Sequence, residues 1–261
     1  MIMTFYKYQG TGNDFVIVDN RLQTIDKNNT KRIAELCDRR FGIGADGFIL
    51  LENDENVDFK MVYYNADGNE SSMCGNGGRC IVAFAKFLGI IEDETEFIAI
   101  DGLHKAKIES DTVYLQMQDV SEIQTFENHQ FLDTGSPHHV ELVDHILEID
   151  VDVKNRGRKI RYGEPYNTKG VNVNFVRQIF NNMFSVYTYE RGVEDETLSC
   201  GTGVTAAALA MHKIGKAAVT DVEIKTKGGS LKVTFDINGD GYNNIWLIGP
   251  TEQVFKGEIE W

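Results

Sequence analysis

The sequence has little proline, cysteine or basic charge, and each shortage narrows the choice of protein class. Only 3 prolines and 4 cysteines occur in 261 residues. These are too few for a proline-rich linker, and the cysteines are too scattered for a disulfide scaffold. The 26 basic residues are outnumbered by 40 acidic ones, which gives a net charge of −14. We therefore expect no nucleic-acid partner, because an acidic surface repels a phosphate backbone.

Long apolar runs are also missing. No stretch reaches the roughly 18 apolar residues that a membrane-spanning helix requires. Residues 1–8 alternate apolar and polar side chains, which indicates a first strand rather than a signal peptide. With 42% hydrophobic and 25% charged residues, the chain has the composition of a globular protein with a sizeable core. We expect a cytoplasmic protein, without a membrane partner, whose cysteines are thiols.

Strands dominate the local patterns. Some segments alternate apolar and polar residues and are rich in β-branched and aromatic side chains, whereas others are short, continuous apolar runs typical of buried strands. Glycine and Asn/Asp clusters separate them. The sequence thus predicts a β-rich α+β fold. The alternating segments are Thr112–Met117, Phe184–Tyr189 and Leu231–Phe235, and the apolar runs are Phe15–Val18, Phe48–Leu51 and Ile245–Ile248.

Three segments have helical patterns. Ile81–Leu88 and Val204–Ile214 are apolar nearly all round, which is typical of buried helices. Each is followed by a glycine, a frequent residue just beyond a helix end. Thr30–Cys37 has the pattern of an amphipathic surface helix.

The two apolar helices belong to an internal repeat with an offset of 126 positions. A whole unit recurs: an alternating strand, an acidic loop, Cys-Gly-x-Gly and a buried helix. We predict two similar lobes produced by duplication, one of residues 1–118 together with 250–261, the other of residues 119–249. The matched pairs are Tyr63 with Tyr189, Glu70 with Glu196, Cys74 with Cys200, Gly77 with Gly203 and Gly89 with Gly215.

Cys74 and Cys200 each precede a buried helix within a glycine-rich turn. Glycines let the backbone approach a ligand closely, and a helix N-terminus carries about half a positive charge. Such a turn can hold a carboxylate, and the same field favours a thiolate. Cys37 and Cys80 are interpreted as small packing residues.

Several chemistries remain open for this pair. Structural zinc needs four ligands at a closer spacing, so we expect no metal. A thiol hydrolase using His138 would leave the second Cys-Gly-x-Gly unexplained, and a non-catalytic amino-acid-binding protein is a further alternative. Two thiols on opposite faces of one carbon have a use that needs both. One thiolate removes a proton, and the other thiol delivers one from the far side.

Seven motifs in order carry a resemblance that extends over essentially the whole chain. The sequence resembles the diaminopimelate epimerase family of bacterial lysine biosynthesis. The resemblance implies two pseudo-symmetric lobes, each a sheet rolled around a central helix, with the last strand returning to the first lobe. It also implies an isomerase, without pyridoxal phosphate or another cofactor, that interconverts LL- and meso-diaminopimelate, and a homodimer. The motifs begin at Gly10, Gly42, Tyr64, Met73, Val171, Tyr189 and Ser199.

Family roles carry over to matching positions of this sequence. Cys74 and Cys200 resemble the acid–base pair, and His138 with Glu190 the residues that tune ionisation. Gly75, Asn76, Gly201 and Thr202 resemble the backbone donors for the reacting carboxylate. A guanidinium suits a distal carboxylate and oxygen acceptors suit a distal ammonium. The residues that resemble this distal substrate-binding set are Asn13, Asn65, Asn172, Glu190 and Arg191.

The sequence departs from the family pattern at two positions. Ser136 stands where the family commonly has Asn, which puts a substrate contact there in doubt, and Gly47 stands where some members carry Gln. A proline or hydroxyproline racemase of the same superfamily is the nearest rival, but those enzymes typically show His at the position of Asn76. The related isomerases without paired cysteines are disfavoured by Cys74 and Cys200.

Overall fold

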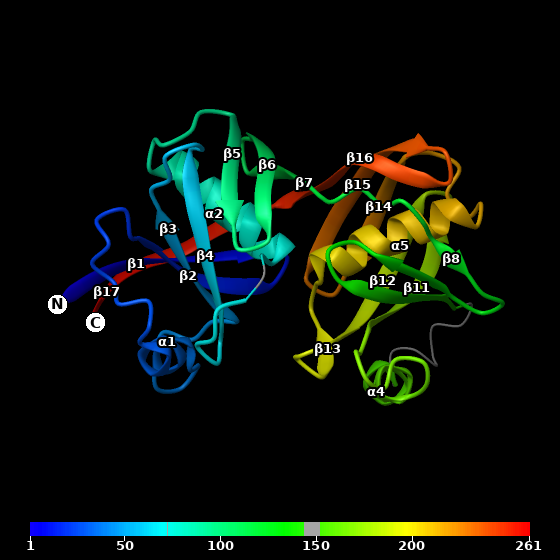
Figure 1. Cartoon of the computed structure of the whole chain (residues 1–261), viewed down its shortest axis with the longest axis horizontal. Coiled ribbons are helices and arrows are strands. Elements are labelled where there is room, and N and C mark those ends of the chain that lie inside the picture. Colours follow the sequence, from blue (N-terminus) through cyan, green and yellow to red (C-terminus); the bar gives the residue numbers. More distant parts are fainter. Residues whose placement is uncertain (72, 144–151) are drawn as a thin grey trace. The chain divides into compact units, whose positions relative to one another are not determined.

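The computed structural model describes residues 1–71, 73–143 and 152–261. The chain divides into two units, of which one comprises Met1–Leu115 with Gly249–Trp261 and the other Gln116–Ile248. We call them the N-terminal and the C-terminal lobe (Figure 1).

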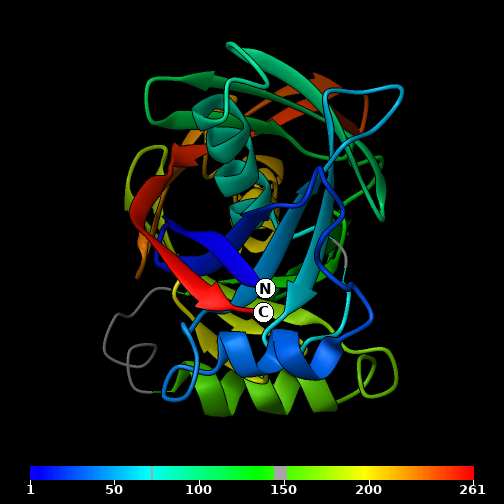
Figure 2. The same ribbon diagram turned by 90° about the vertical axis from the view of Figure 1, so that its left-hand side faces the viewer.

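The N-terminal lobe is a strongly bent sheet whose inner face packs against one buried helix. Helix α2 (Gly75–Phe87) contacts β1, β2, β3 and β6, and α1 (Thr30–Cys37) lies against β3 on the other face. Strand β1 pairs with β17, so the last strand of the chain belongs to the N-terminal lobe, and the two chain ends lie side by side (Figure 1 and Figure 2). The strands are β1 (Ile2–Gly10), β2 (Asn13–Asp19), β3 (Gly47–Glu52), β4 (Phe59–Asn65), β5 (Glu94–Ala99), β6 (Gly102–Glu109), β7 (Thr112–Gln116) and β17 (Glu252–Glu260).

The C-terminal lobe repeats this plan. Helix α5 (Gly201–Lys213) packs against β9 to β12, β14 and β15, while α4 (Val153–Tyr162) covers β11 and β12 from the other side. The parallel pairs β2–β3 and β4–β5 recur as β10–β11 and β12–β14. The predicted β-rich fold with two similar halves is therefore confirmed. The strands are β8 (Gln124–Thr125), β9 (Gln130–Asp133), β10 (Pro137–Leu142), β11 (Asn172–Phe180), β12 (Met183–Glu190), β13 (Asp195–Thr197), β14 (Asp221–Thr226), β15 (Gly229–Asn238) and β16 (Gly241–Pro250).

The two central helices match residue for residue. Each has 13 residues and begins at the glycine that follows a cysteine. Both are followed by a glycine with positive φ, 70° at Gly89 and 71° at Gly215, which an L-residue adopts only with strain. Both helices are buried over most of their length, as their all-round apolar sequences predict.

The predicted match of Tyr63 with Tyr189 is wrong by one residue. The Tyr63 ring packs edge-on against Phe15, with a centroid distance of 6.1 Å. Tyr189 instead lies in the hydrophobic cluster beneath α4, and its counterpart is Tyr64, which lies in the cluster beneath α1. The loop between strand and cysteine is one residue longer in the C-terminal lobe, so the 126-residue offset holds for the helices and not for these strands.

Helix α4 was not predicted, because its sequence, VKNRGRKIRY, has six basic or amide side chains and few apolar ones. Close packing on the sheet holds this helix in place: at Gly157 the helix backbone approaches Tyr189 so closely that a Cβ on the glycine would lie 2.3 Å from the Tyr189 Cβ.

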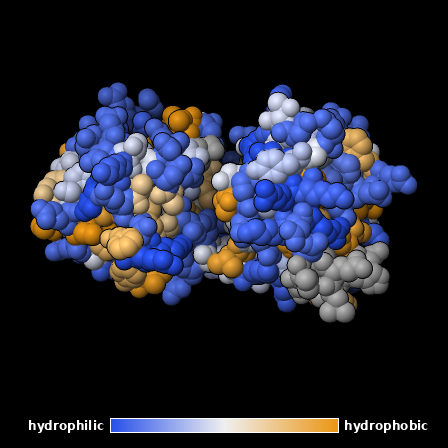
Figure 3. Space-filling view, turned by 90° about the horizontal axis from the view of Figure 1, so that it is seen from below, coloured by the Kyte–Doolittle hydropathy of each residue, from blue (hydrophilic) through white to orange (hydrophobic). Residues whose placement is uncertain are grey.

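The face of the molecule in Figure 3 is mostly hydrophilic, with scattered apolar side chains. Within the described ranges no helix is long and apolar enough to cross a membrane.

Candidate active site

Cys74 and Cys200 occupy the same position in their lobes, the residue that caps the N-terminus of the central helix. The first helical hydrogen bonds run from the Gly78 N–H to the Cys74 carbonyl (2.7 Å) and from the Val204 N–H to the Cys200 carbonyl (2.9 Å). The three preceding N–H groups of each helix therefore have no carbonyl of their own helix to bind. Each thiol thus stands beside backbone donors at the positive end of a helix.

The Cys74 thiol lies next to an oriented amide. It donates to Asn13 Oδ1 (3.5 Å), and the same oxygen accepts from Asn76 Nδ2 (3.2 Å). Asn13 Nδ2 donates to Asp46 Oδ2 over 2.7 Å. Because a carboxylate only accepts hydrogen bonds, Asp46 fixes which end of the Asn13 amide faces the thiol.

A charge network holds Asp46 in place. Arg39 donates to Asp46 Oδ1 (2.7 Å) and binds both oxygens of Asp14 (3.0 and 2.6 Å). Lys7 Nζ pairs with Asp14 Oδ2 at 2.7 Å. Burial raises the pKa of Asp14, but hydrogen bonds and charges from Arg39 and Lys7 outweigh burial and hold that pKa well below its usual range. Asp14 is therefore ionised at neutral pH.

A buried cation lies in the first turns of α2. Arg79 has no exposed surface and donates to Thr11 Oγ1 (3.3 Å) and to the Gly75 carbonyl (3.5 Å). Burial lowers the pKa of Arg79, and negative charge on Cys80 or Cys74 acts in the opposite direction. The helix therefore favours an anion near its start.

The corresponding turn of α5 carries hydroxyl groups. Cys200 Sγ lies 3.5 Å from Thr202 Oγ1, and Cys200 is 8% exposed. The Thr202 carbonyl accepts from Thr134 Oγ1 (2.9 Å), and Thr205 Oγ1 donates to the Gly201 carbonyl (3.0 Å). These bonds fix the backbone that surrounds the thiol.

Ser136 forms one hydrogen-bonded cluster in the C-terminal lobe with two predicted substrate-binding residues, Asn172 and Arg191. Asn172 Nδ2 donates to Ser136 Oγ (2.8 Å), and its Oδ1 accepts from the Arg191 N–H (2.9 Å). The Arg191 guanidinium also reaches Ser136 Oγ (3.3 Å). Ser136 thus shares its hydroxyl with both side chains.

Two further predicted residues lie at strand ends. Glu190 is the last residue of β12 and is half-buried. Asn65 is the last residue of β4, is exposed and lies opposite Gly47 in the β3–β4 register. Both positions directly precede the loops that lead to the two cysteines.

His138 lies fully buried on β10, where its side chain joins a polar network. Asn174 Nδ2 donates to His138 Nδ1 (2.9 Å) and to the His139 carbonyl (3.2 Å), while Thr188 Oγ1 donates to Asn174 Oδ1 (2.9 Å). Burial, reinforced by the positive charge of Arg191, lowers the pKa of His138 to about 3. His138 is therefore a neutral imidazole at neutral pH.

Sequence reasoning missed Asp46, Asn174 and Thr188. Asp46 lies at the end of the motif that begins at Gly42, and nothing in the sequence pairs it with Asn13. The signal for Asn174 was present in Val171-Asn-Val-Asn-Phe175, where two asparagines alternate with valines and so share one face of a strand. Nothing in the sequence pairs either asparagine with His138.

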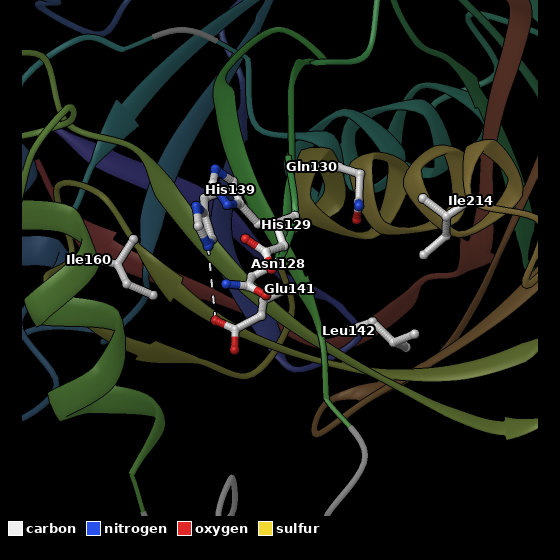
Figure 4. A pocket seen from close by; sticks show the side chains of 9 residues that line it. Asn128, His129, Gln130, His139, Glu141, Leu142, Ile160 and Ile214 are labelled. Carbon is white, nitrogen blue, oxygen red and sulfur yellow. Dashed lines mark ion pairs between the residues drawn. The ribbon is translucent and has the colours of Figure 1, made fainter. Parts of the chain in front are cut away.

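His139 points to the opposite side of β10 and lines a separate cavity of about 570 Å³ (Figure 4). Its ring stacks on His129 with centroids 4.1 Å apart, and its Nε2 lies 4.0 Å from Glu141. None of the predicted site residues lines this cavity. Across the described part of the chain, no group of three or more His, Cys, Asp or Glu side chains could hold a metal ion.

The sequence matches known proteins over nearly its whole length. A family model described as diaminopimelate epimerase matches residues 5–122 and 130–252. The diaminopimelate epimerase of Flavobacterium psychrophilum is 58% identical over 98% of this chain and 100% of its own length. That of Chlorobaculum tepidum is 40% identical over 96% and 98%.

Solved structures share the fold at low identity. A Bacillus anthracis phenazine biosynthesis protein of the PhzF family covers 100% of both chains with a TM-score of 0.77 and 12% identity. A hydroxyproline epimerase from Agrobacterium vitis covers 99% of this chain and 92% of its own, with a TM-score of 0.69 and 13% identity. The structural matches show the fold alone, whereas the sequence matches identify the family. This chain belongs to the diaminopimelate epimerase family of isomerases.

Proposed function

We propose that this protein interconverts LL- and meso-diaminopimelate by moving a proton at one α-carbon between two thiols. The thiolate of one cysteine takes the α-proton and becomes a thiol. The thiol of the other cysteine then gives its proton to the opposite face and becomes the thiolate. Bonds and protons balance over this step without a cofactor, and Cys74 and Cys200 are the pair that we assign to it.

The observation that carries the proposal is the equivalent placement of the two thiols. Each caps a 13-residue buried helix and is followed by glycine. Removal of the α-proton leaves negative charge that spreads to the carboxylate, and preorganised N–H donors stabilise such charge most effectively. We assign the N–H groups of Gly75 and Asn76, and of Gly201 and Thr202, to the reacting carboxylate.

We assign the distal end of the substrate to polar side chains at or next to strand ends. The Arg191 guanidinium is exposed and already oriented by Ser136 and by the Lys169 carbonyl, so it can bind a carboxylate through two parallel hydrogen bonds. We assign the distal ammonium to acceptors from Asn13, Asn65, Asn172 and Glu190. We also propose a cytoplasmic homodimer, on the family resemblance alone.

The test is α-deuterium incorporation from D₂O with LL-diaminopimelate as substrate, followed by mass spectrometry and by the change in optical rotation. The wild-type protein should give inverted product that carries one solvent deuterium. Cys74→Ser and Cys200→Ser should each lower kcat by about 10²–10⁴, the usual contribution of a positioned acid or base.

Cys37→Ala and Cys80→Ala are the matched controls. Both thiols are buried, and burial raises the pKa of each to about 12, so their removal should leave turnover unchanged. Full turnover by Cys200→Ser would disprove the two-thiol mechanism.

The rival reaction, racemisation of proline or hydroxyproline, is tested in the same assay. Those substrates carry no second amino-acid end to bind Arg191, Asn172 and Ser136. We expect no deuterium exchange with either imino acid, and exchange at a rate similar to that with diaminopimelate would favour the rival.

A further inference from the structure

The polar network beneath α5 contains one hydrogen-bonding group without a partner. His138 Nε2 is buried and makes no hydrogen bond within the part of the chain that the structure describes. Its other ring nitrogen, Nδ1, is bound to Asn174. Leaving a buried polar group unsatisfied costs about 1–3 kcal/mol, so the position of the imidazole proton matters.

The orientation of the Asn174 amide is fixed by two neighbours of opposite kind. The His139 carbonyl, 3.2 Å away, can only accept, so the nitrogen of the amide must face it. Thr188 Oγ1 lies 2.9 Å from the amide oxygen and donates to it. A flipped amide would place its oxygen against a carbonyl oxygen and is therefore excluded.

This orientation determines the tautomer of His138. The Asn174 NH₂ group, which can only donate, lies 2.9 Å from His138 Nδ1. Nδ1 must therefore carry the lone pair, and the single proton of the neutral ring must lie on Nε2. An imidazolium would set an N–H against an NH₂, so the network opposes protonation independently of burial.

The network also lies at the start of α5. A Cβ on Gly203 would fall 2.4 Å from Asn174 Oδ1, 3.3 Å from Thr188 Oγ1 and 3.4 Å from Cys200 Cβ. Asn174 is thus packed directly beneath the turn that carries Cys200. Arg191 is the charged group that acts on His138, and it also disfavours a second positive charge there.

We propose that Asn174 and Thr188 are positioning residues that hold His138 as a neutral imidazole with its proton on Nε2. In this form the unpartnered Nε2 of His138 is a hydrogen-bond donor that is available to the negative charge of the reaction, and His138 does not act as a base. The inference rests on the proposed function, because that function supplies the negative charge.

The first test is the tautomer itself, measured by ¹⁵N NMR of histidine side chains in the wild-type protein at neutral pH. The chain has six histidines, and His138→Gln assigns the signal. We expect an unprotonated Nδ1 and a protonated Nε2. A proton on Nδ1, or an imidazolium, would overturn the proposal.

The second test is Asn174→Asp. A carboxylate at this position accepts from Nδ1, so it should move the proton to Nδ1 of the neutral ring and remove the donor at Nε2. We expect kcat to fall at least about tenfold at pH 8, with KM changed less than about threefold, since one donor to a developing charge contributes about this much or more. Lower pH should restore part of kcat, because the carboxylate favours an imidazolium that again carries a proton on Nε2. An unchanged rate and an unchanged pH profile would contradict the proposal.

Thr188→Val and Ser185→Ala form a matched pair on β12. Both remove a buried hydroxyl group, but Ser185 Oγ has no hydrogen-bond partner among the described residues, whereas Thr188 Oγ1 binds Asn174. We expect mixed tautomers and a lower kcat for Thr188→Val only. Identical behaviour of the two variants would remove Thr188 from the network. If the wild-type tautomer is as expected but no epimerisation of diaminopimelate occurs, the proposed function fails and the tautomer assignment stands.

Discussion

The two lobes share the same arrangement of strands and helices, but the buried polar groups lie on the central helix in one lobe and on the sheet beneath the helix in the other. In the N-terminal lobe the sheet face beneath α2 is formed by Phe15, Ile49 and Tyr63, and the buried charge belongs to the helix, at Arg79. In the C-terminal lobe the corresponding sheet face carries His138, Asn174 and Thr188. A duplicated scaffold can therefore keep its backbone while the buried ionisable group comes from the helix in one lobe and from the sheet in the other.

The helix positions make the exchange visible. Arg79 Nη1 donates to the Gly75 carbonyl, and 126 positions later Thr205 Oγ1 donates to the Gly201 carbonyl. The equivalent backbone carbonyl thus accepts a hydrogen bond from a cation in one lobe and from a neutral hydroxyl group in the other. We infer that the two thiols stand in different electrostatic surroundings despite their equivalent positions.

The largest effect is expected where a methyl group would strike the polar face. A Cβ on Gly203 would lie 2.4 Å from Asn174 Oδ1, an atom held by a hydrogen bond from Thr188. A Cβ on Gly77 would meet only the ends of apolar side chains, Ile49 Cδ1 at 3.2 Å and Phe15 Cε1 at 3.4 Å. Gly203→Ala should lower the free energy of unfolding by about 2–3 kcal/mol, and Gly77→Ala by less than about 1.5 kcal/mol.

Urea unfolding at constant m-value measures both changes. The difference between the lobes would be refuted if Gly77→Ala cost as much as Gly203→Ala. It would be sharpened if Gly203→Ala also displaced the His138 nitrogen signals, since that would tie the stability loss to the polar network.

The second largest effect is expected in acid, where the C-terminal lobe should lose stability at a higher pH than the N-terminal lobe. Burial lowers the pKa of His138 and His139 to about 3, against about 6.5 in an unfolded chain. Between pH 6.5 and about 3 the unfolded chain binds protons that the folded lobe does not. The free energy of unfolding therefore decreases as the pH is lowered through this range, by up to about 1.4 kcal/mol per pH unit for each histidine. In the N-terminal lobe the lowered pKa of Asp14 means that its contribution is present above about pH 4 and is lost only at lower pH.

One tryptophan in each lobe makes this measurable. Trp246 lies on β16 and Trp261 follows β17, so Trp246→Phe and Trp261→Phe leave a single reporter in one lobe. Fluorescence during acid titration should change at higher pH for Trp246 than for Trp261. Coincident transitions would show that the buried histidines do not set the acid sensitivity of the C-terminal lobe.

Sequence reasoning succeeded where the signal is local. An apolar run that ends at glycine indicated α2 and α5, and the apolar runs indicated β2, β3 and β16. The predicted starts at Ile81 and Val204 were too late, because the glycines after each cysteine belong to the first turn of the helix and not to a preceding turn. Sequence reasoning failed where contacts cross long stretches of chain. His138 meets Asn174 only because β10 pairs in parallel with β11, and a connection that contains α4 separates these strands. Parallel pairing leaves no mark on either strand that identifies the partner.

The register error has the same origin. Periodicity places Tyr63 and Tyr189 on alternating strands, but only burial against α2 or α4 decides which face each ring takes. A single extra residue in the loop before Cys200 moves the match from Tyr63 to Tyr64. Since a shift of one residue turns a side chain to the other face of a strand, a repeat read from sequence needs contacts to fix it.

The smallest effect should be the one in which the lobes do not differ. Gly89 and Gly215 have φ values of 70° and 71°, and a Cβ at either position would meet nothing within 4 Å. Alanine at each should therefore cost only its backbone strain, about 1–2 kcal/mol, and the two costs should agree within about 0.5 kcal/mol. Urea unfolding of Gly89→Ala with Trp261 as reporter and of Gly215→Ala with Trp246 measures them separately. A difference above about 1 kcal/mol would mean that the lobes also diverge where their helices end, and that the polar face beneath α5 is only one of several departures from the duplicated frame.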